Sequence, residues 1–170
     1  MALLTVRDLC VTIGRVQPLD RISLEVDKGQ ILGVVGESGS GKSLTAMAIM
    51  GLLPLMGGRV SSGSIQFGGT ELVGLNEGVY RALRGQRLAL ITQNPMTSLD
   101  PMIKVGLQVD QVATLHLGLT ASAAKARTVD LLQQLRIPDA ATVYHQYPHQ
   151  MSGGMKQRIV IAMALAGDPD

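Results

Sequence analysis

The chain has 170 residues, enough for one domain with its own core, and a formal net charge of +2. Apolar residues make up 46% of the chain and charged residues 16%, a balance that excludes a disordered protein. The small charge does not indicate a polyanionic partner, and an aromatic content of 2% leaves few side chains on which nucleic-acid bases could stack. We therefore expect no nucleic-acid partner.

The cysteine count, the N-terminal segment and the longest apolar stretch bear on the cellular compartment of the protein. The one cysteine, Cys10, excludes an intrachain disulfide, fits a reducing compartment and is expected to be a small buried apolar residue. The N-terminal segment meets Arg7 and Asp8 too early for the core of a signal peptide. The longest apolar stretch, Leu44 to Met56, is shorter than the roughly 18 residues that a membrane span needs. We expect a cytosolic protein.

The first half of the chain is predicted to be rich in β-structure. Leu4 to Ile13 and Ile22 to Val26 read as strands. Ile31 to Val35 is short and almost entirely apolar, which is typical of a strand buried on both faces of a parallel sheet. Ser43 to Leu53 is rich in helix formers. Further elements are expected in this half: strands at Arg59 to Phe67 and Leu88 to Thr92, and a short helix at Glu77 to Arg84.

The second half, from Pro95 onward, is predicted to be helical. Helices are expected at roughly Ile103 to Leu117, Ser122 to Leu135 and Ser152 to Ala166. No proline- or serine-rich linker separates the halves. The sequence therefore predicts one α/β domain with two lobes, a β-rich lobe over residues 1–93 and a helical lobe over residues 94–170.

A glycine-rich loop follows the apolar run that ends at Val35. Its residues are Gly36, Glu37, Ser38, Gly39, Ser40, Gly41, Lys42 and Ser43, which match the phosphate-binding pattern GxxxxGK[ST]. Glycines permit backbone N–H groups to approach a phosphate chain, and the following helix adds the positive end of its dipole. Lys42 would reach the β- and γ-phosphates, and the Ser43 hydroxyl would bind Mg²⁺. The alternative is a flexible turn with a solvated lysine, but the flanking strand and helix favour a nucleotide site.

Two later segments could also contact a metal ion, a water molecule or an anion. Gln93 begins QNPMTSLDP, where its amide oxygen could contact a metal or a water, although a polar loop residue is the simpler interpretation. Ser152 is a good N-cap, and Gly153 and Gly154 leave N–H groups uncovered at the start of the last helix. This helix start is either a second anion site or an ordinary capped helix.

In combination, the three segments resemble a known family. GESGSGKS, the glutamine loop and MSGGMKQR occur in this order and resemble the ATP-binding subunit of an ABC transporter. The longer stretches GESGSGKSLTAMAIMGLLP, ITQNPMTSLDP and YPHQMSGGMKQRIVIAMAL resemble the subfamily that powers bacterial uptake of dipeptides, oligopeptides and nickel. The resemblance covers almost the whole chain and implies a P-loop NTPase fold of the ABC type.

The resemblance also implies partners and residue roles. Two ATP-binding subunits, identical or different, face each other head to tail, with ATP and Mg²⁺ between the P-loop of one and the signature segment of the other. Ser43 and Gln93 would contact Mg²⁺, and Gln93 would couple the attacking water to the helical lobe. That lobe, around Pro95 to Gln150, would dock on integral membrane permease subunits at the cytoplasmic face of the inner membrane, and an extracytoplasmic solute-binding protein would act indirectly. The signature segment comprises Ser152, Gly153, Gly154, Met155, Lys156 and Gln157.

The sequence departs from the family pattern at three places. Ile13 stands where the family usually stacks an aromatic side chain on adenine, so only apolar contact with the base is expected. Gln150 stands where this subfamily commonly has glutamate. The family continues past the signature helix into a strand that ends in Asp-Glu, the Walker B strand, and later reaches a histidine, whereas this chain stops at Asp170. We therefore expect an incomplete core sheet and little or no ATPase activity from this chain alone.

Three functions remain open from the sequence. The first is the ATP-hydrolysing subunit of an importer, with peptides as the first choice of cargo and nickel as the second. The second is a non-hydrolytic, truncated ATP-binding remnant that pairs with an intact paralogue. The third is a soluble ABC ATPase that is not linked to transport. The sequence does not identify the cargo.

Overall fold

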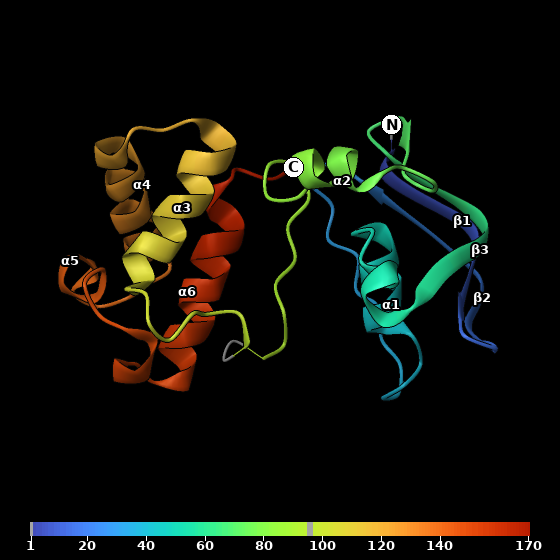
Figure 1. Cartoon of the computed structure of the whole chain (residues 1–170), viewed down its shortest axis with the longest axis horizontal. Helices are drawn as coiled ribbons and strands as arrows, with labels where there is room; N and C mark the ends of the chain where they lie inside the picture. Colours follow the sequence, from blue (N-terminus) through green and yellow to red (C-terminus); the bar gives the residue numbers. More distant parts are fainter. Residues whose placement is uncertain (1, 95–96) are drawn as a thin grey trace. The chain divides into compact units, whose positions relative to one another are not determined.

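The computed structural model describes residues 2–94 and 97–170, so Pro95 and Met96 of the glutamine loop lie outside the described residues. The chain divides into two compact units, Met1–Arg81 and Ala82–Asp170 (Figure 1). The predicted boundary between the lobes lies twelve residues later, at 93/94, because no proline- or serine-rich linker marks the division. None of the helices in the described residues is long and apolar enough to cross a bilayer.

Unit 1 contains an antiparallel sheet. Its strands β1 (Ala2–Ile13), β2 (Val16–Asp27), β3 (Gly58–Phe67) and β4 (Thr70–Glu71) are arranged in the order β2-β1-β3-β4. The strands β1, β2 and β3 confirm predicted strands. Each is longer than predicted, by one to six residues at one or both ends. The apolar side chains of this sheet form the core of the unit, which includes Val6, Leu9, Val11, Leu19, Ile65 and Phe67.

The helix after the glycine-rich loop is shorter than predicted. Helix α1 spans Lys42–Ile49 and is followed by a short 3-10 helix, η1, at Leu53–Met56. Gly51 separates them with a φ of 65°, a left-handed conformation that ends a helix. The ring of Tyr80, from α2 (Glu77–Leu83), packs on Gly51 so closely that a β-carbon there would lie 2.5 Å from Tyr80 Cζ. Gly51 therefore has a packing role as well as a helix-ending one.

The prediction of two further strands is wrong in this structure. Ile31 to Val35 lies outside any strand, and the side chains of Ile31 and Val35 are 95% and 93% exposed. Leu88 to Thr92 has a single β-bridge, between Leu88 and Arg84. A parallel strand that is buried on both faces needs hydrogen-bonded neighbours on both edges. The described residues do not supply such neighbours to either segment.

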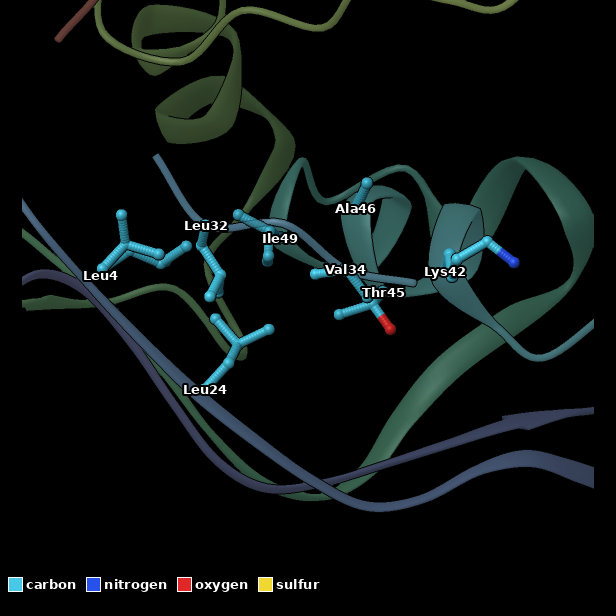
Figure 2. Close-up of a pocket in the computed structure, with 9 residues that line it drawn as sticks. Leu4, Leu24, Leu32, Val34, Lys42, Thr45, Ala46 and Ile49 are labelled. Carbon is cyan, nitrogen blue, oxygen red and sulfur yellow. The ribbon is translucent and has the colours of Figure 1, made fainter. Parts of the chain in front are cut away.

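One face of the Ile31 to Val35 segment nevertheless points toward the sheet (Figure 2), although Leu32 and Val34 are 42% and 54% exposed. Leu32 and Val34 point toward the sheet and α1, where Figure 2 shows them with Leu4, Leu24 and Ile49. Together these side chains line an apolar cavity of ≈ 290 Å³. The alternation expected of a strand is therefore present, and this face positions the start of the glycine-rich loop.

Unit 2 is helical, as predicted. Its helices are α3 (Val105–Leu117), α4 (Ala121–Gln134), α5 (Ala140–Val143) and α6 (Gly153–Ala166), of which only the short α5 was not expected from the sequence. Helix α6 packs against α3 and α4, so the helix with the predicted signature segment is part of the core. This core contains side chains from all four helices, among them Val105, Val109, Leu132, Val143, Ile159 and Ala162.

A carboxylate joins three segments of unit 2. Asp110 on α3 accepts a hydrogen bond of 2.6 Å from Thr128 Oγ1 on α4 and another from the hydroxyl of Tyr144, the residue that caps the C-terminus of α5. The side chains of Thr128 and Tyr144 are buried. Burial, together with the hydrogen bond to Asp110 and its negative charge, raises the pKa of Tyr144 to about 12.

Alkaline unfolding should report this raised pKa. The contribution of the Tyr144 hydroxyl to stability is complete below about pH 10, the ordinary pKa of tyrosine, and is lost as the pH rises through about 12. We expect Tyr144→Phe to flatten the fall in the free energy of unfolding across this window, measured by urea denaturation followed by circular dichroism. Thr128→Val, which keeps the phenol, should retain the steep fall. If the free energy of unfolding fell equally steeply with pH in wild type and Tyr144→Phe, this hydroxyl would not contribute to the pH dependence of stability.

Candidate phosphate-binding site

The glycine-rich loop has the conformation that its glycines permit. Gly39 and Gly41 have φ angles of 85° and 91°, in the region that favours glycine. A β-carbon on Gly41 would lie 2.3 Å from Leu19 Cδ2, so a side chain there would require the Leu19 side chain on β2 to move. A β-carbon on Gly39 would meet nothing within 4 Å. The loop is thus fixed against the sheet at Gly41 and open at Gly39.

Backbone donors are exposed where this loop enters α1. The first N–H groups of a helix have no intrahelical acceptor. In the described part of the chain, the N–H groups of Gly39, Gly41 and Ser43 make no hydrogen bond, whereas Ser40 N donates to Glu37 O at 3.2 Å and closes a turn. The free N–H groups and the positive end of the α1 dipole make this loop suitable for an anion.

The ammonium of Lys42 lies at the loop. Its Nζ donates hydrogen bonds to Gly36 O at 2.8 Å, to Glu37 O at 2.6 Å and to Ser40 Oγ at 3.2 Å. Figure 2 shows the Nζ pointing away from the apolar side chains of the cavity beneath α1. The alternative of a merely solvated lysine does not fit this geometry. Phosphate oxygens could replace the three acceptors, because each is an exposed oxygen atom of the loop.

Ser43 has the chemistry that a magnesium ion requires. It is exposed in the first turn of α1, next to Lys42, and its hydroxyl is the hard oxygen donor that Mg²⁺ prefers. The described residues include no group of three or more His, Cys, Asp or Glu side chains that could hold a metal ion. Ser43 therefore fits a cation that takes its other ligands from phosphate and water, the usual arrangement for Mg²⁺ at a nucleotide.

Gln93 lies in unit 2, in an exposed bend after Thr92. Thr92 Oγ1 is 2.7 Å from Ser98 Oγ, and Thr97 Oγ1 donates to Asn94 O at 3.1 Å, so hydroxyl groups hold the backbone on either side of the glutamine. Among the described residues the Gln93 side chain makes no hydrogen bond. Its amide is thus available to a ligand.

The predicted signature segment forms the start of α6. Ser152 caps the helix and accepts a hydrogen bond from Met155 N at 3.4 Å. Gly153 and Gly154 are exposed, and a β-carbon on either would meet nothing within 4 Å. The first turn of α6 is therefore uncovered within its own chain. The later signature residues anchor this turn, since Met155 and Gln157 are half-buried and Lys156 is 9% exposed.

The departure at Gln150 is accommodated. Gln150 Oε1 accepts a hydrogen bond from Tyr147 N at 2.8 Å, closing the short 3-10 helix Pro148–Gln150 that leads into the signature. A glutamate oxygen could accept the same bond, so the amide preserves the local cap.

Sequence reasoning missed one element of the site, the packing of Leu19 on Gly41. The expected second strand began only at Ile22, whereas β2 begins at Val16 and brings Leu19 to the loop. The available signal was an isolated pair of apolar residues, Val16 and Leu19, in an otherwise polar stretch. Ile13, the predicted base contact, is half-buried at the end of β1, where it pairs with Val16 and Gly58.

Comparisons with known proteins identify the family of the chain. The family model described as ABC transporter matches residues 19–170. The oligopeptide transport ATP-binding protein OppD of Bacillus subtilis is 46% identical over 98% of this chain and 48% of its own length. The dipeptide transport ATP-binding protein DppD of Haemophilus influenzae is 48% identical over 99% of this chain and 52% of its own length. The chain thus spans about half the length of these relatives.

Solved structures show the same fold. A dimeric ATP-binding cassette in a post-hydrolysis state, bound to ADP and phosphate, superposes with a TM-score of 0.84 at 20% identity, over 98% of this chain and 70% of that one. An ATP-binding subunit of an ABC transporter superposes with a TM-score of 0.76 at 27% identity, over 98% of this chain and 63% of that one. These matches, together with the family model over most of the sequence, confirm the resemblance first read from three short segments: the chain belongs to the ATP-binding family of ABC transporters.

Proposed function

We propose that this chain is the nucleotide-binding part of a subunit that powers peptide import by ATP binding and hydrolysis. The observation that carries the proposal is the loop at the start of α1, where Lys42 Nζ lies 2.6 to 2.8 Å from two loop carbonyl oxygens beside unpaired N–H groups. This is a site for an extended anion with several oxygens, such as a triphosphate. The peptide transport names of the relatives support the choice of cargo, and nickel is the second choice.

Each residue of the loop would have a distinct task in the reaction. The N–H groups of Gly39 and Gly41 and the Lys42 ammonium would hold the β- and γ-phosphates in line for transfer to water. The Ser43 hydroxyl would supply one ligand to Mg²⁺, which when bound neutralises charge on the phosphates. Gln93 would orient the attacking water beside that ion.

A second subunit would complete the site. Gly153 and Gly154 are exposed at the start of α6 and offer their N–H groups to a ligand. No side chain of this helical turn obstructs an approaching phosphate. We propose that Ser152, Gly153 and Gly154 contact the γ-phosphate held by the P-loop of a partner subunit, identical or different. The dimeric state in the name of a solved cassette supports this arrangement. In this proposal the helical unit docks on permease subunits at the cytoplasmic face of the membrane.

A non-hydrolytic role for these 170 residues alone is the second candidate. The carboxylates nearest the end of α6 are engaged, because Asp170 Oδ2 lies 2.6 Å from Arg87 Nε and Asp168 Oδ1 lies 3.5 Å from Arg127. Neither is placed as a free general base. In this candidate, a partner subunit would supply the carboxylate that hydrolysis requires.

Uptake by cells tests the proposal. In a strain whose chromosomal copy carries Lys42→Ala, we expect uptake of a labelled dipeptide or tripeptide to be lost and nickel uptake to be unchanged. Lys28→Ala, at an exposed turn of the same unit, is the matched control and should leave uptake intact. Loss of nickel uptake with unchanged peptide uptake would identify nickel as the cargo. Unchanged uptake of both, with the protein absent from the membrane fraction, would favour an ABC ATPase that is not linked to transport.

A further inference from the structure

The first turn of α3 lies at a junction within unit 2. Figure 1 shows the starts of α3 and α6 at the same end of this unit. The segment that ends the glutamine loop, residues 97–103, leads into α3, and the segment that leads into the signature, residues 144–150, precedes α6. Both segments form hydrogen bonds with the first turn of α3. The neighbourhoods of Gln93 and Ser152 therefore meet at one helix start.

Gln108 makes the contact to the end of the glutamine loop. Its side chain is 5% exposed. Oε1 accepts a hydrogen bond from Asp100 N at 2.9 Å, and Nε2 donates to Asp100 O at 2.9 Å and to Ile103 O at 2.8 Å. The amide thus uses both of its N–H groups and its carbonyl oxygen on the backbone of a neighbouring segment. A buried amide that is bonded in this way fixes that segment to its own helix.

The segment held by Gln108 is also anchored by apolar packing. Leu99 is 6% exposed and belongs to the core that α3 and α6 share. Asp100, the next residue, is exposed, and its carbonyl oxygen also accepts a hydrogen bond of 3.3 Å from Ile103 N. Leu99 therefore holds the inner side of this turn and Gln108 holds its outer side. Loss of the Gln108 amide would free the turn without opening the core.

The same helical turn binds the segment before the signature. Val105 N donates to Gln146 O at 2.9 Å, and Gly106 N donates to Tyr144 O at 3.1 Å. N–H groups at the start of a helix have no intrahelical acceptor, so these carbonyl oxygens satisfy two of them. The ring of Tyr144 also packs on Gly106 and leaves no room for a β-carbon there. This segment continues into the signature, so the start of α3 positions the signature as well.

From these contacts we infer that Gln108 is a positioning residue that couples the glutamine loop to the signature segment. The inference rests on the proposed function, in which Gln93 acts at the nucleotide of its own subunit and Ser152 at that of a partner. It adds the physical link: a displacement of the loop is carried by the Gln108 amide to the first turn of α3, and from there to the segment before Ser152. ATP bound in one subunit thereby favours the arrangement of its own signature that pairs with a partner.

Gln108→Met tests this link, because methionine has the length of glutamine but cannot make these hydrogen bonds. We expect the dissociation constant of ATP for the dilute, unpaired chain to stay within about twofold of wild type, since Lys42 is unchanged. The ATP concentration for half-maximal pairing, measured by analytical ultracentrifugation, should rise about tenfold or more, because coupling between two sites is typically worth about 5- to 150-fold. Gln111→Met, at an exposed position of α3, is the matched control and should alter neither quantity.

Gln108→Glu is a second variant that keeps a polar side chain of the same length. Above neutral pH its carboxylate can still accept from Asp100 N, but an oxygen replaces the amide donor and repels the carbonyl groups of Asp100 and Ile103. We expect the same result as for Gln108→Met, with ATP binding retained and pairing impaired. Amide exchange in peptides that cover residues 97–103 should become faster in both variants, because the turn is freed.

The comparison of binding with pairing separates coupling from a structural role. Wild-type pairing in both variants, with faster exchange at residues 97–103, would show that Gln108 only stabilises the turn, and would overturn the inference. Weakened ATP binding by either folded variant would overturn it as well, because Gln108 would then act on nucleotide binding itself. Absence of ATP-dependent pairing in the wild-type chain, both alone and with an intact paralogue, would instead refute the proposed function, and the inference with it.

Discussion

Replacing Lys42 with alanine is expected to weaken ATP binding about 100-fold or more, because the ammonium provides charge-assisted hydrogen bonds to phosphate that no other side chain of the loop can replace. The fold should survive the change. The hydrogen bonds of Lys42 Nζ are to loop atoms, at Gly36 O, Glu37 O and Ser40 Oγ, and its loss leaves exposed carbonyls that water can solvate. Equilibrium dialysis with labelled ATP measures the effect.

Lys28→Ala is the control for this experiment. It removes the same charge from an exposed turn of the same unit, and any nonspecific effect of net charge on ATP binding would appear there too. We expect wild-type affinity for this variant. Unchanged ATP affinity in Lys42→Ala, with circular dichroism that matches wild type, would contradict the assignment of the loop as a phosphate site.

The second large effect is expected at the start of α6. Ser152→Arg should leave ATP binding to the single chain intact and abolish ATP-dependent pairing, because a long cation would fill the uncovered surface above Gly153 and Gly154. Analytical ultracentrifugation with and without ATP measures pairing, either of the chain with itself or with an intact paralogue. The lost cap should cost about 1 kcal/mol of stability, which a folded unit 2 can tolerate.

Ser122→Arg provides the matched comparison, since it places the same side chain in the exposed first turn of α4. We expect normal pairing from this variant. If Ser152→Arg instead destroyed ATP binding by the isolated chain, the signature segment would act within its own chain and the trans site would be wrong.

The features that sequence predicted well are those set by local chemistry. Glycine spacing before Lys42 anticipated the left-handed backbone at Gly39 and Gly41. Ser152 was expected as an N-cap because its side chain and the helix it begins are adjacent in the chain. The family, too, could be predicted from short segments, and the match over residues 19–170 confirms it. The roles of Gln93 and the signature residues in ATP chemistry stay predictions.

The features that sequence did not predict depend on distant partners. The almost entirely apolar run of Ile31 to Val35 predicted burial on both faces, whereas only Leu32 and Val34 line the cavity under α1. An apolar pattern cannot tell whether hydrogen-bonded neighbours exist. The contact of Leu19 with Gly41 joins residues 22 positions apart. Asp110 joins Thr128 and Tyr144 across two loops, and nothing in the local pattern marks these three as partners.

Amide hydrogen exchange followed by mass spectrometry, with and without ATP and Mg²⁺, tests the two-site mechanism most directly. We expect ATP to slow exchange in peptides that cover Gly36 to Ser43 at any protein concentration. Slowed exchange in peptides that cover Ser152 to Gly154 should appear only at concentrations where the chain pairs, and should be absent in Ser152→Arg. If ATP left the exchange of Gly36 to Ser43 unchanged in a folded chain, the loop would not bind the nucleotide, and the proposed function would be contradicted.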